Sequence, residues 1–169
     1  MTDATVIDPA AWLERTQPGF EHVSAEERAA IRDFALLWSL YEGTVLGTWG
    51  NAGTIVADVT SLKASGRLTL NSIREPIEHF RSRYFDGTEL TYAYGMLYLR
   101  PNDQPNLVER VVRKQSDDEV EILSAVMIIV LRLRNNLFHG LKWAYDMRDQ
   151  LENFRSANQV LMAVMDMHR

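Results

Sequence analysis

The sequence predicts an all-α protein, a helical bundle of antiparallel long helices with short accessory helices. Three observations support this prediction. Apolar residues recur at helical spacing in several long segments. Apolar residues make up 46% of the chain, which argues against disorder. The one segment rich in strand-forming aromatic residues has no second strand to pair with. A length of 169 residues fits a single domain, 1–169, that is large enough to bury a core.

The first part of the chain, residues 1–23, is predicted to form a partly irregular N-terminal arm. Pro9, Pro18 and Gly19 interrupt it and disfavour a continuous helix. The arm nevertheless carries large apolar side chains that can attach it to the body of the protein, namely Trp12, Leu13 and Phe20.

Two helices are expected next. Ser24 and Glu27 form a capping-box pattern, in which each side chain bonds the other residue's backbone N–H. This pattern opens a long helix over about 24–45, with apolar residues on one stripe. A second helix is predicted from Asn51 to Ala64, and Gly66 ends it.

The middle of the chain gives weaker signals. Residues 71–84 have apolar side chains at helical spacing, and Pro76 indicates either a kink or a late start of that helix. Residues 89–99 (ELTYAYGMLYL) fit a strand or a helix, and the lack of a partner strand favours a helix. Residues 100–106 (RPNDQPN) are predicted to be a loop, and 107–114 a short helix.

The last third of the sequence predicts the centre of the bundle. Ser116-Asp117-Asp118-Glu119 supplies an N-cap and first-turn acids. A central helix, apolar on almost all sides, follows from 119 to about 138. Its apolar belt, 126–133, exceeds what one face needs, and we expect part of it to form a two-fold dimer. The last long helix is predicted over 141–167.

The overall composition limits the function classes. The net charge is −5 and the pI about 5.4, which disfavours non-specific, charge-driven binding to nucleic acid. The absence of cysteine excludes disulfides, zinc thiolates and a thiol nucleophile. The N-terminus has no signal-peptide pattern, and the longest charge-free apolar run, 123–131, is too short to span a bilayer. We therefore expect a cytoplasmic protein that does not associate with membranes.

The stretch RNNLFHG, residues 134–140, stands out at the end of the central helix. The imidazole of His139 can transfer protons near neutral pH, and the guanidinium of Arg134 can bind a phosphate oxygen bidentately. Asn135 or Asn136 can orient the phosphate or the imidazole. These groups suit cleavage of RNA, whose 2′-hydroxyl supplies the nucleophile, so neither a metal nor a cofactor is expected. On a straight helix, however, Arg134 and His139 point roughly 140° apart.

This motif resembles the signature of the HEPN superfamily of small helical-bundle domains, which is Arg, four to six residues, then His, often with a polar residue after the Arg. Here the matching residues are Arg134, Asn135 and His139. An apolar helix precedes the motif, and a long amphipathic segment follows it, as in the family. The stretch FALLWSLYE, 34–42, is similar to the first-helix segment of some members. Over the other two-thirds of the chain the resemblance is one of architecture.

The resemblance implies a metal-independent endoribonuclease in which two chains form one composite cleft, and a role as a toxin or defence component. Arg134 would then steady the phosphate, His139 would act as acid or base, and Asn135 would position both. An antitoxin or another regulatory protein is a candidate partner. Leu141 occupies the position where one toxin group has a modified Tyr, which disfavours a nucleotidyltransferase antitoxin.

The motif also has other interpretations. The resemblance also allows a non-catalytic module that binds a partner protein or a nucleotide, and the acidic pI favours it slightly. Glu42, the one acid within an apolar helical segment, is a candidate partner of Arg134 or His139, and Asn136 is a second candidate for a supporting role. A cap and ion pair at a helix C-terminus would explain Arg134 and His139 without any activity.

The remaining polar residues carry weaker signals. A small basic stripe is the expected place for RNA backbone contacts, if RNA binds; it consists of Arg110, Arg113 and Lys114. The other histidines show no metal-ligand spacing and are interpreted as surface residues; they are His22, His79 and His168. Trp38 and Trp143 are interpreted as core residues rather than base-stacking platforms.

Overall fold

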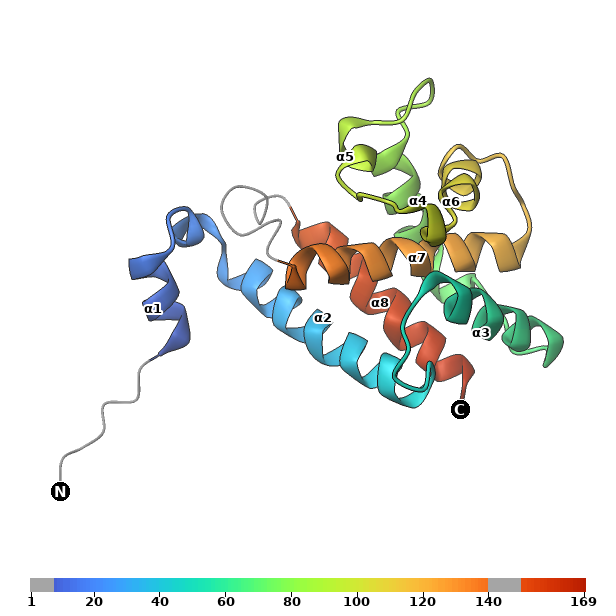
Figure 1. The fold of residues 1–169 in the computed structure, drawn as a ribbon, viewed down its shortest axis with the longest axis horizontal. Helices are drawn as coiled ribbons and strands as arrows, with labels where there is room; N and C mark the ends of the chain where they lie inside the picture. The colour runs from blue at the N-terminus through green and yellow to red at the C-terminus, as the bar shows by residue number, and fades with distance from the viewer. Residues whose placement is uncertain (1–7, 140–149) are drawn as a thin grey trace.

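A computed structural model describes residues 8–139 and 150–169, and these residues form an all-α bundle (Figure 1). In the described part of the chain the only strand-like pairing is an isolated antiparallel bridge between Phe85 and Leu90. The α-helices are α1 (Pro9–Thr16), α2 (Ala25–Thr44), α3 (Ala52–Ala64), α4 (Arg74–Tyr84), α5 (Tyr92–Gly95), α6 (Pro105–Val112), α7 (Glu119–Phe138) and α8 (Leu151–Met167). Short 3₁₀ helices cover Phe20–His22, Asn71–Ile73 and Pro101–Asp103.

The predicted helix starts are confirmed where a side chain caps the backbone. Ser24 accepts a hydrogen bond from the backbone N–H of Glu27, and the Glu27 carboxylate accepts one from the N–H of Ser24. Asn51 caps α3, and Asp118 caps α7 by accepting from two backbone N–H groups. Pro76 lies in the first turn of α4, where no intrahelical N–H is needed, so it marks a late helix start rather than a kink.

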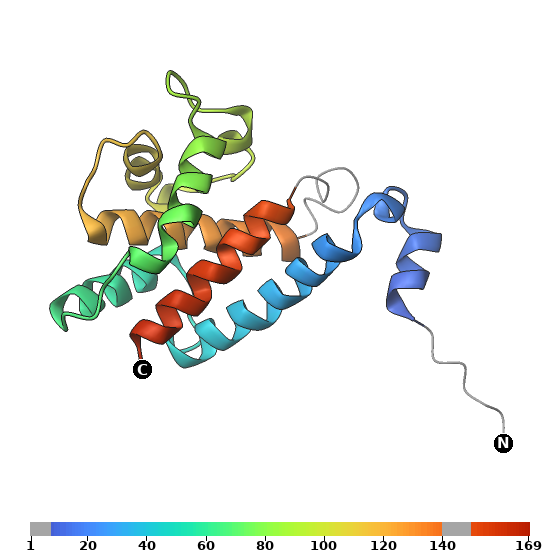
Figure 2. The same ribbon diagram turned by 180° about the vertical axis from the view of Figure 1, so that it is seen from behind.

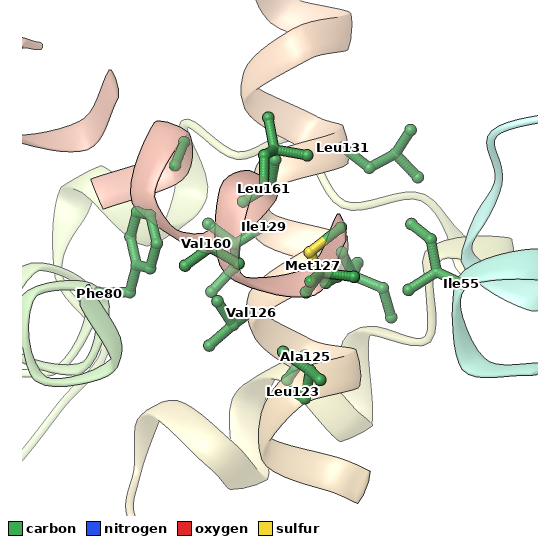
Figure 3. Packing of buried hydrophobic residues seen from close by; sticks show 14 of the residues in the cluster. Ile55, Phe80, Leu123, Ala125, Val126, Met127, Ile129, Leu131, Val160 and Leu161 are labelled. Atoms are coloured by element: carbon green, nitrogen blue, oxygen red, sulfur yellow. The ribbon is translucent and has the colours of Figure 1, made fainter. Parts of the chain in front are cut away.

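Helix α7 forms the centre of the core. Every residue from Ile122 to Leu133 is buried. Figure 3 shows its apolar side chains between those of α3 on one side and those of α4 and α8 on the other, with Ile55, Phe80 and Val160 among the neighbours. The prediction that the belt 126–133 contributes to a dimer interface is therefore wrong, because this chain's own helices already cover the belt.

The long helices are not all antiparallel, which corrects the predicted arrangement. Helices α2 and α8 run side by side in the same direction (Figure 2). Their contacts advance together along both helices, since Arg155 pairs with Glu26 and the Asn158 amide donates to the carbonyl of Ala30. Helix α7 runs antiparallel to α2. The end of α7 lies against α2, which brings Arg134 to that helix (Figure 1).

The N-terminal arm is more ordered than predicted. Residues Pro9–Thr16 form helix α1 because Asp8 accepts from the N–H of Ala10 and Pro9 occupies the first helical position. Phe20 and Val23 are buried and pack with Leu13 and Leu137, so the arm is attached to the end of α7. The expectation that Leu13 and Phe20 attach the arm is confirmed, whereas Trp12 is 44% exposed.

The helix predicted over 89–99 is reduced to the four residues of α5. The chain leaves the helix after α5, where Tyr98 has a φ of 50° and side chains from α7 bind two backbone carbonyls. Arg132 Nε donates to the carbonyl of Leu97 at 3.0 Å, and Asn136 Nδ2 donates to that of Met96 at 3.1 Å. The predicted loop over 100–106 contains a 3₁₀ turn, and α6 begins inside it at Pro105. Within the described ranges no helix has the length and apolarity to cross a bilayer.

Candidate active site at the end of helix α7

The Arg134 side chain lies in a cluster built by α2 and the last turn of α7. Its guanidinium carbon lies 5.9 Å from the ring centre of Trp38 and 5.4 Å from that of Phe138. Nη1 donates to Asn135 Oδ1 at 3.0 Å, and Nη2 lies 3.6 Å from Glu42 Oε2. Nε is buried and has no hydrogen-bond partner among the described residues. These contacts hold the guanidinium in place. Because the side chain remains 31% exposed, the remaining N–H groups of Nη1 and Nη2 can still donate to a ligand.

Glu42 is the anchor of this cluster. One carboxylate oxygen, Oε2, accepts a hydrogen bond from Trp38 Nε1 at 3.0 Å, and the other, Oε1, accepts one from the backbone N–H of Gly50 at 3.1 Å. Trp38 and Glu42 are four residues apart on α2, which places them on one helical face. The structure thus brings Glu42 to Arg134. Among the described residues no hydrogen bond or ion pair joins Glu42 to His139.

Gly50 fits tightly against the anchor. A Cβ atom at this position would lie 2.5 Å from Glu42 Oε1 and 3.0 Å from Trp38 Cζ2. Both distances are shorter than ordinary carbon contacts, so any side chain here would displace the carboxylate. No sequence pattern indicates this role, because Gly50 follows Glu42 by eight residues across a loop.

His139 lies at the C-cap of α7, and its backbone N–H donates to the carbonyl of Asn135 at 2.9 Å. The residue is exposed, and no hydrogen bond to its imidazole is found within residues 8–139 and 150–169. Because α7 keeps its helical register to Phe138, Arg134 and His139 leave the helix in different directions and do not meet within one chain. Gly140 and Leu141 lie outside the described residues.

Asn136 does not support the Arg134 cluster. It is 1% exposed, and its amide donates to the carbonyls of Met96 and Leu97 and accepts weakly from Arg132. Arg132 itself is 2% exposed and pairs with Asp103, with Nη1 3.3 Å from Oδ2. Burial lowers the pKa of the Arg132 guanidinium, and the nearby charge of Asp103 opposes this shift. Asn136 and Arg132 therefore fix the 96–103 segment to α7.

The basic stripe on and after α6 is neutralised by acids. Each of its cations has an ion-pair partner: Arg110 with Glu121, Arg113 with Glu109, and Lys114 with Glu78. Glu121 and Arg134 are separated by about 20 Å along α7, at roughly 1.5 Å per residue. The stripe is thus remote from the motif and offers little free positive charge.

Two of the other histidines are not simple surface residues. His79 is partly buried and its Nε2 lies 2.8 Å from Oδ1 of the buried Asn153. His168 Nε2 lies 3.0 Å from Asp58 Oδ1. Only His22 fits the surface interpretation. No group of three or more histidine or acidic side chains suited to a metal ion occurs in the described parts of the chain.

The structure places Trp38 in the core, at 2% exposure, as predicted. Its contact with Arg134 was missed, as was that of Phe138. The four-residue spacing of Trp38 and Glu42 on one helix face is the signal that indicates the contact between Trp38 and Arg134. The contact between Phe138 and Arg134 follows from their spacing of four residues on α7. Trp143 lies outside the described residues.

Comparisons of the chain with known protein families, with curated proteins and with solved structures found no match.

Proposed function

We propose that this chain is a metal-independent endoribonuclease of the HEPN type that acts as a homodimer. The observation that carries the proposal is the Arg134 cluster. A partly exposed guanidinium, held by Glu42 and Asn135 near two aromatic rings, lies five residues before an exposed histidine. A fixed guanidinium with unused donors is suited to a phosphate whose negative charge increases during the reaction.

In the proposed reaction the 2′-hydroxyl of RNA attacks the adjacent phosphorus. An imidazole of His139 accepts the hydroxyl proton, and Arg134 stabilises the charge on the non-bridging oxygens. The bond from phosphorus to the 5′-oxygen then breaks, and a second imidazole gives that oxygen a proton. The products are a 2′,3′-cyclic phosphate and a 5′-hydroxyl. Asn135 positions Arg134 through the hydrogen bond from Nη1.

The proposal requires two chains, because Arg134 and His139 diverge on one α7 helix. A two-fold axis near the end of α7 would place His139 of each chain close to the same phosphate. Light scattering that gives a monomer mass at micromolar concentration would remove the composite site from the proposal.

The test is cleavage of RNA by purified protein in EDTA. Wild type should cleave RNA, leave DNA intact and produce 2′,3′-cyclic phosphate ends. His139→Ala and Arg134→Ala should each lower cleavage at least about a hundredfold, the usual scale for losing one acid–base or electrostatic group. Arg134→Lys should be nearly as damaging, since an ammonium lacks the planar fork. Each variant must keep wild-type helicity and mass. RNA cleavage by a folded His139→Ala variant, or cleavage that requires Mg²⁺, would contradict the mechanism.

A second candidate function is a non-catalytic module that binds a partner protein or a nucleotide. It is favoured by the ion pair of Arg134 with Glu42, because a carboxylate 3.6 Å from the guanidinium opposes the approach of a phosphate. The basic stripe likewise attracts RNA phosphates only weakly, because each of its cations is paired with an acid. Absence of cleavage of any RNA by a well-folded wild-type dimer would select this function. A role as a toxin or defence component, with or without an antitoxin, is proposed only together with the endoribonuclease activity.

A further inference from the structure

Trp49 is an exposed aromatic side chain on a well-fixed loop. It lies between α2 and α3 and is 76% exposed, more than any other described tryptophan. Its carbonyl accepts hydrogen bonds from Thr54 Oγ1 at 2.7 Å and from Asn51 Nδ2 at 3.4 Å, and its N–H donates to the carbonyl of Leu46. A large apolar ring kept in water by a fixed backbone is typical of a binding residue.

The Trp49 loop is bonded to the same residue that anchors Arg134. Thr48 N–H donates to the backbone carbonyl of Glu42 at 2.9 Å, and Gly50 N–H donates to Glu42 Oε1 at 3.1 Å. Both neighbours of Trp49 are thus fixed to Glu42. Thr48 has a φ of 70°, which a β-branched residue rarely adopts and which only surrounding contacts can maintain. The position of Trp49 is therefore coupled to that of the Arg134 guanidinium.

A second exposed ring lies next to Arg134. Phe138 is 59% exposed, its ring centre lies 5.4 Å from the guanidinium carbon of Arg134, and His139 follows it directly. One aromatic ring is thus presented from the α2–α3 loop and one from the end of α7. Each is linked to Arg134 either directly or through Glu42.

We infer that Trp49, together with Phe138, forms a stacking platform for unpaired nucleobases of a single-stranded RNA. This inference rests on the proposed function, since it takes RNA as the ligand of the Arg134 site. Every nucleobase has a π face, so stacking binds single strands with little regard to sequence, and a paired base cannot offer that face. Stacking also supplies affinity where charge does not, because the chain carries a net charge of −5 and its basic stripe is paired.

The test measures binding apart from cleavage. A fluorescently labelled single-stranded oligoribonucleotide is titrated with His139→Ala protein in EDTA, and its anisotropy is followed. Adding Trp49→Ala should weaken binding about tenfold, a typical loss for one stacking ring. Trp49→Phe should retain most of the affinity, because it keeps an aromatic face. The matched control is Tyr92→Ala, which removes a ring that is 85% exposed on α5 and should leave binding unchanged. The same RNA as a duplex should bind weakly.

Several results would overturn the platform. These are unchanged RNA binding by Trp49→Ala, equal binding of duplex and single strand, no RNA binding at all, or a lower oligomer mass for Trp49→Ala, which would assign Trp49 to an interface with a second copy. The nuclease proposal fails separately. If RNA binds through Trp49 but wild type never cleaves it, the stacking platform is supported and the nuclease proposal is contradicted. If wild type cleaves RNA and Trp49→Ala changes neither KM nor binding, the nuclease stands and the platform does not.

Discussion

Glu42 on α2 and Arg134 on α7 form an ion pair, with Oε2 3.6 Å from Nη2, at the point where the two antiparallel helices meet. The carboxylate is itself held by hydrogen bonds from the Trp38 indole and the Gly50 backbone. The place of the guanidinium is therefore set by α2 and by the loop after it, as well as by α7. This dependence can be tested without changing either member of the pair.

Gly50→Ala should lower RNA cleavage while the fold survives. The new Cβ would lie 2.5 Å from Glu42 Oε1, at the flexible end of that side chain, so the carboxylate moves and no longer supports Arg134. Losing the Gly50 hydrogen bond should reduce the free energy of unfolding by about 1 kcal/mol. Urea unfolding and RNA cleavage are the two measurements.

Gly43→Ala is the matched control for that substitution. Gly43 lies within α2, and a Cβ there would meet no atom within 4 Å. Because alanine favours the helix over glycine, this variant should gain about 0.5–1 kcal/mol in the free energy of unfolding and keep wild-type cleavage. Equal cleavage by the Gly50→Ala and Gly43→Ala variants would show that the Glu42 position does not matter.

Glu42→Gln separates the charge of the anchor from its shape. Glutamine still offers an oxygen to Trp38 or Gly50, so the fold should be kept, and the loss of a partly exposed ion pair should cost less than about 1 kcal/mol. RNA cleavage should fall because Arg134 loses its charged partner. Glu42→Ala should be less stable than Glu42→Gln, since it leaves two donors unpaired. Cleavage equal to wild type in Glu42→Gln would make Glu42 a packing residue only.

Two arginines of α7 should behave differently on substitution. Arg132→Ala should destabilise the fold by about 3–5 kcal/mol, because it leaves the Asp103 carboxylate, which is mostly buried, without its partner. Arg134→Ala should cost about 1 kcal/mol, since its ion pair is partly exposed. Thermal unfolding of both variants measures the contrast. Similar losses for both would place Arg134 among the structural residues.

Stability should fall at alkaline pH because of buried tyrosines. Burial raises the pKa of Tyr41, with help from Asp58, and burial also raises that of Tyr84, while it raises the pKa of Tyr94 to about 12. The folded state then holds protons that the unfolded state releases near pH 10.0. The full contribution is present below that pH. Above it the buried Tyr41 and Tyr84 each remove about 1.4 kcal/mol per pH unit, and the partly buried Tyr94 removes less.

The measurement is the urea midpoint at about pH 9 and about pH 11, with tyrosinate absorbance followed in parallel. Tyr41→Phe, which cannot ionise, should show a smaller fall between these two values than wild type. A midpoint that stays constant over this range would contradict the assignment of these hydroxyls as protonated and buried.

Local signals in the sequence determined most of the helices. The Ser24–Glu27 capping box, Asn51 and the segment 116–119 each marked a helix start that the structure confirms, because a cap acts within a few residues of the backbone it serves. The apolar pattern of α7 likewise identified the central helix. The motif Arg134 to His139 could also be located from the sequence, and its catalytic role stays a prediction.

Only the tertiary structure decided which residues meet. The parallel course of α2 and α8, the burial of the belt 126–133 and the shortening of the 89–99 helix depend on contacts between segments far apart in the chain. The same holds for Gly50, whose backbone reaches Glu42 across a turn. Such contacts follow from the packing of whole helices, and a short window of sequence carries no record of that packing.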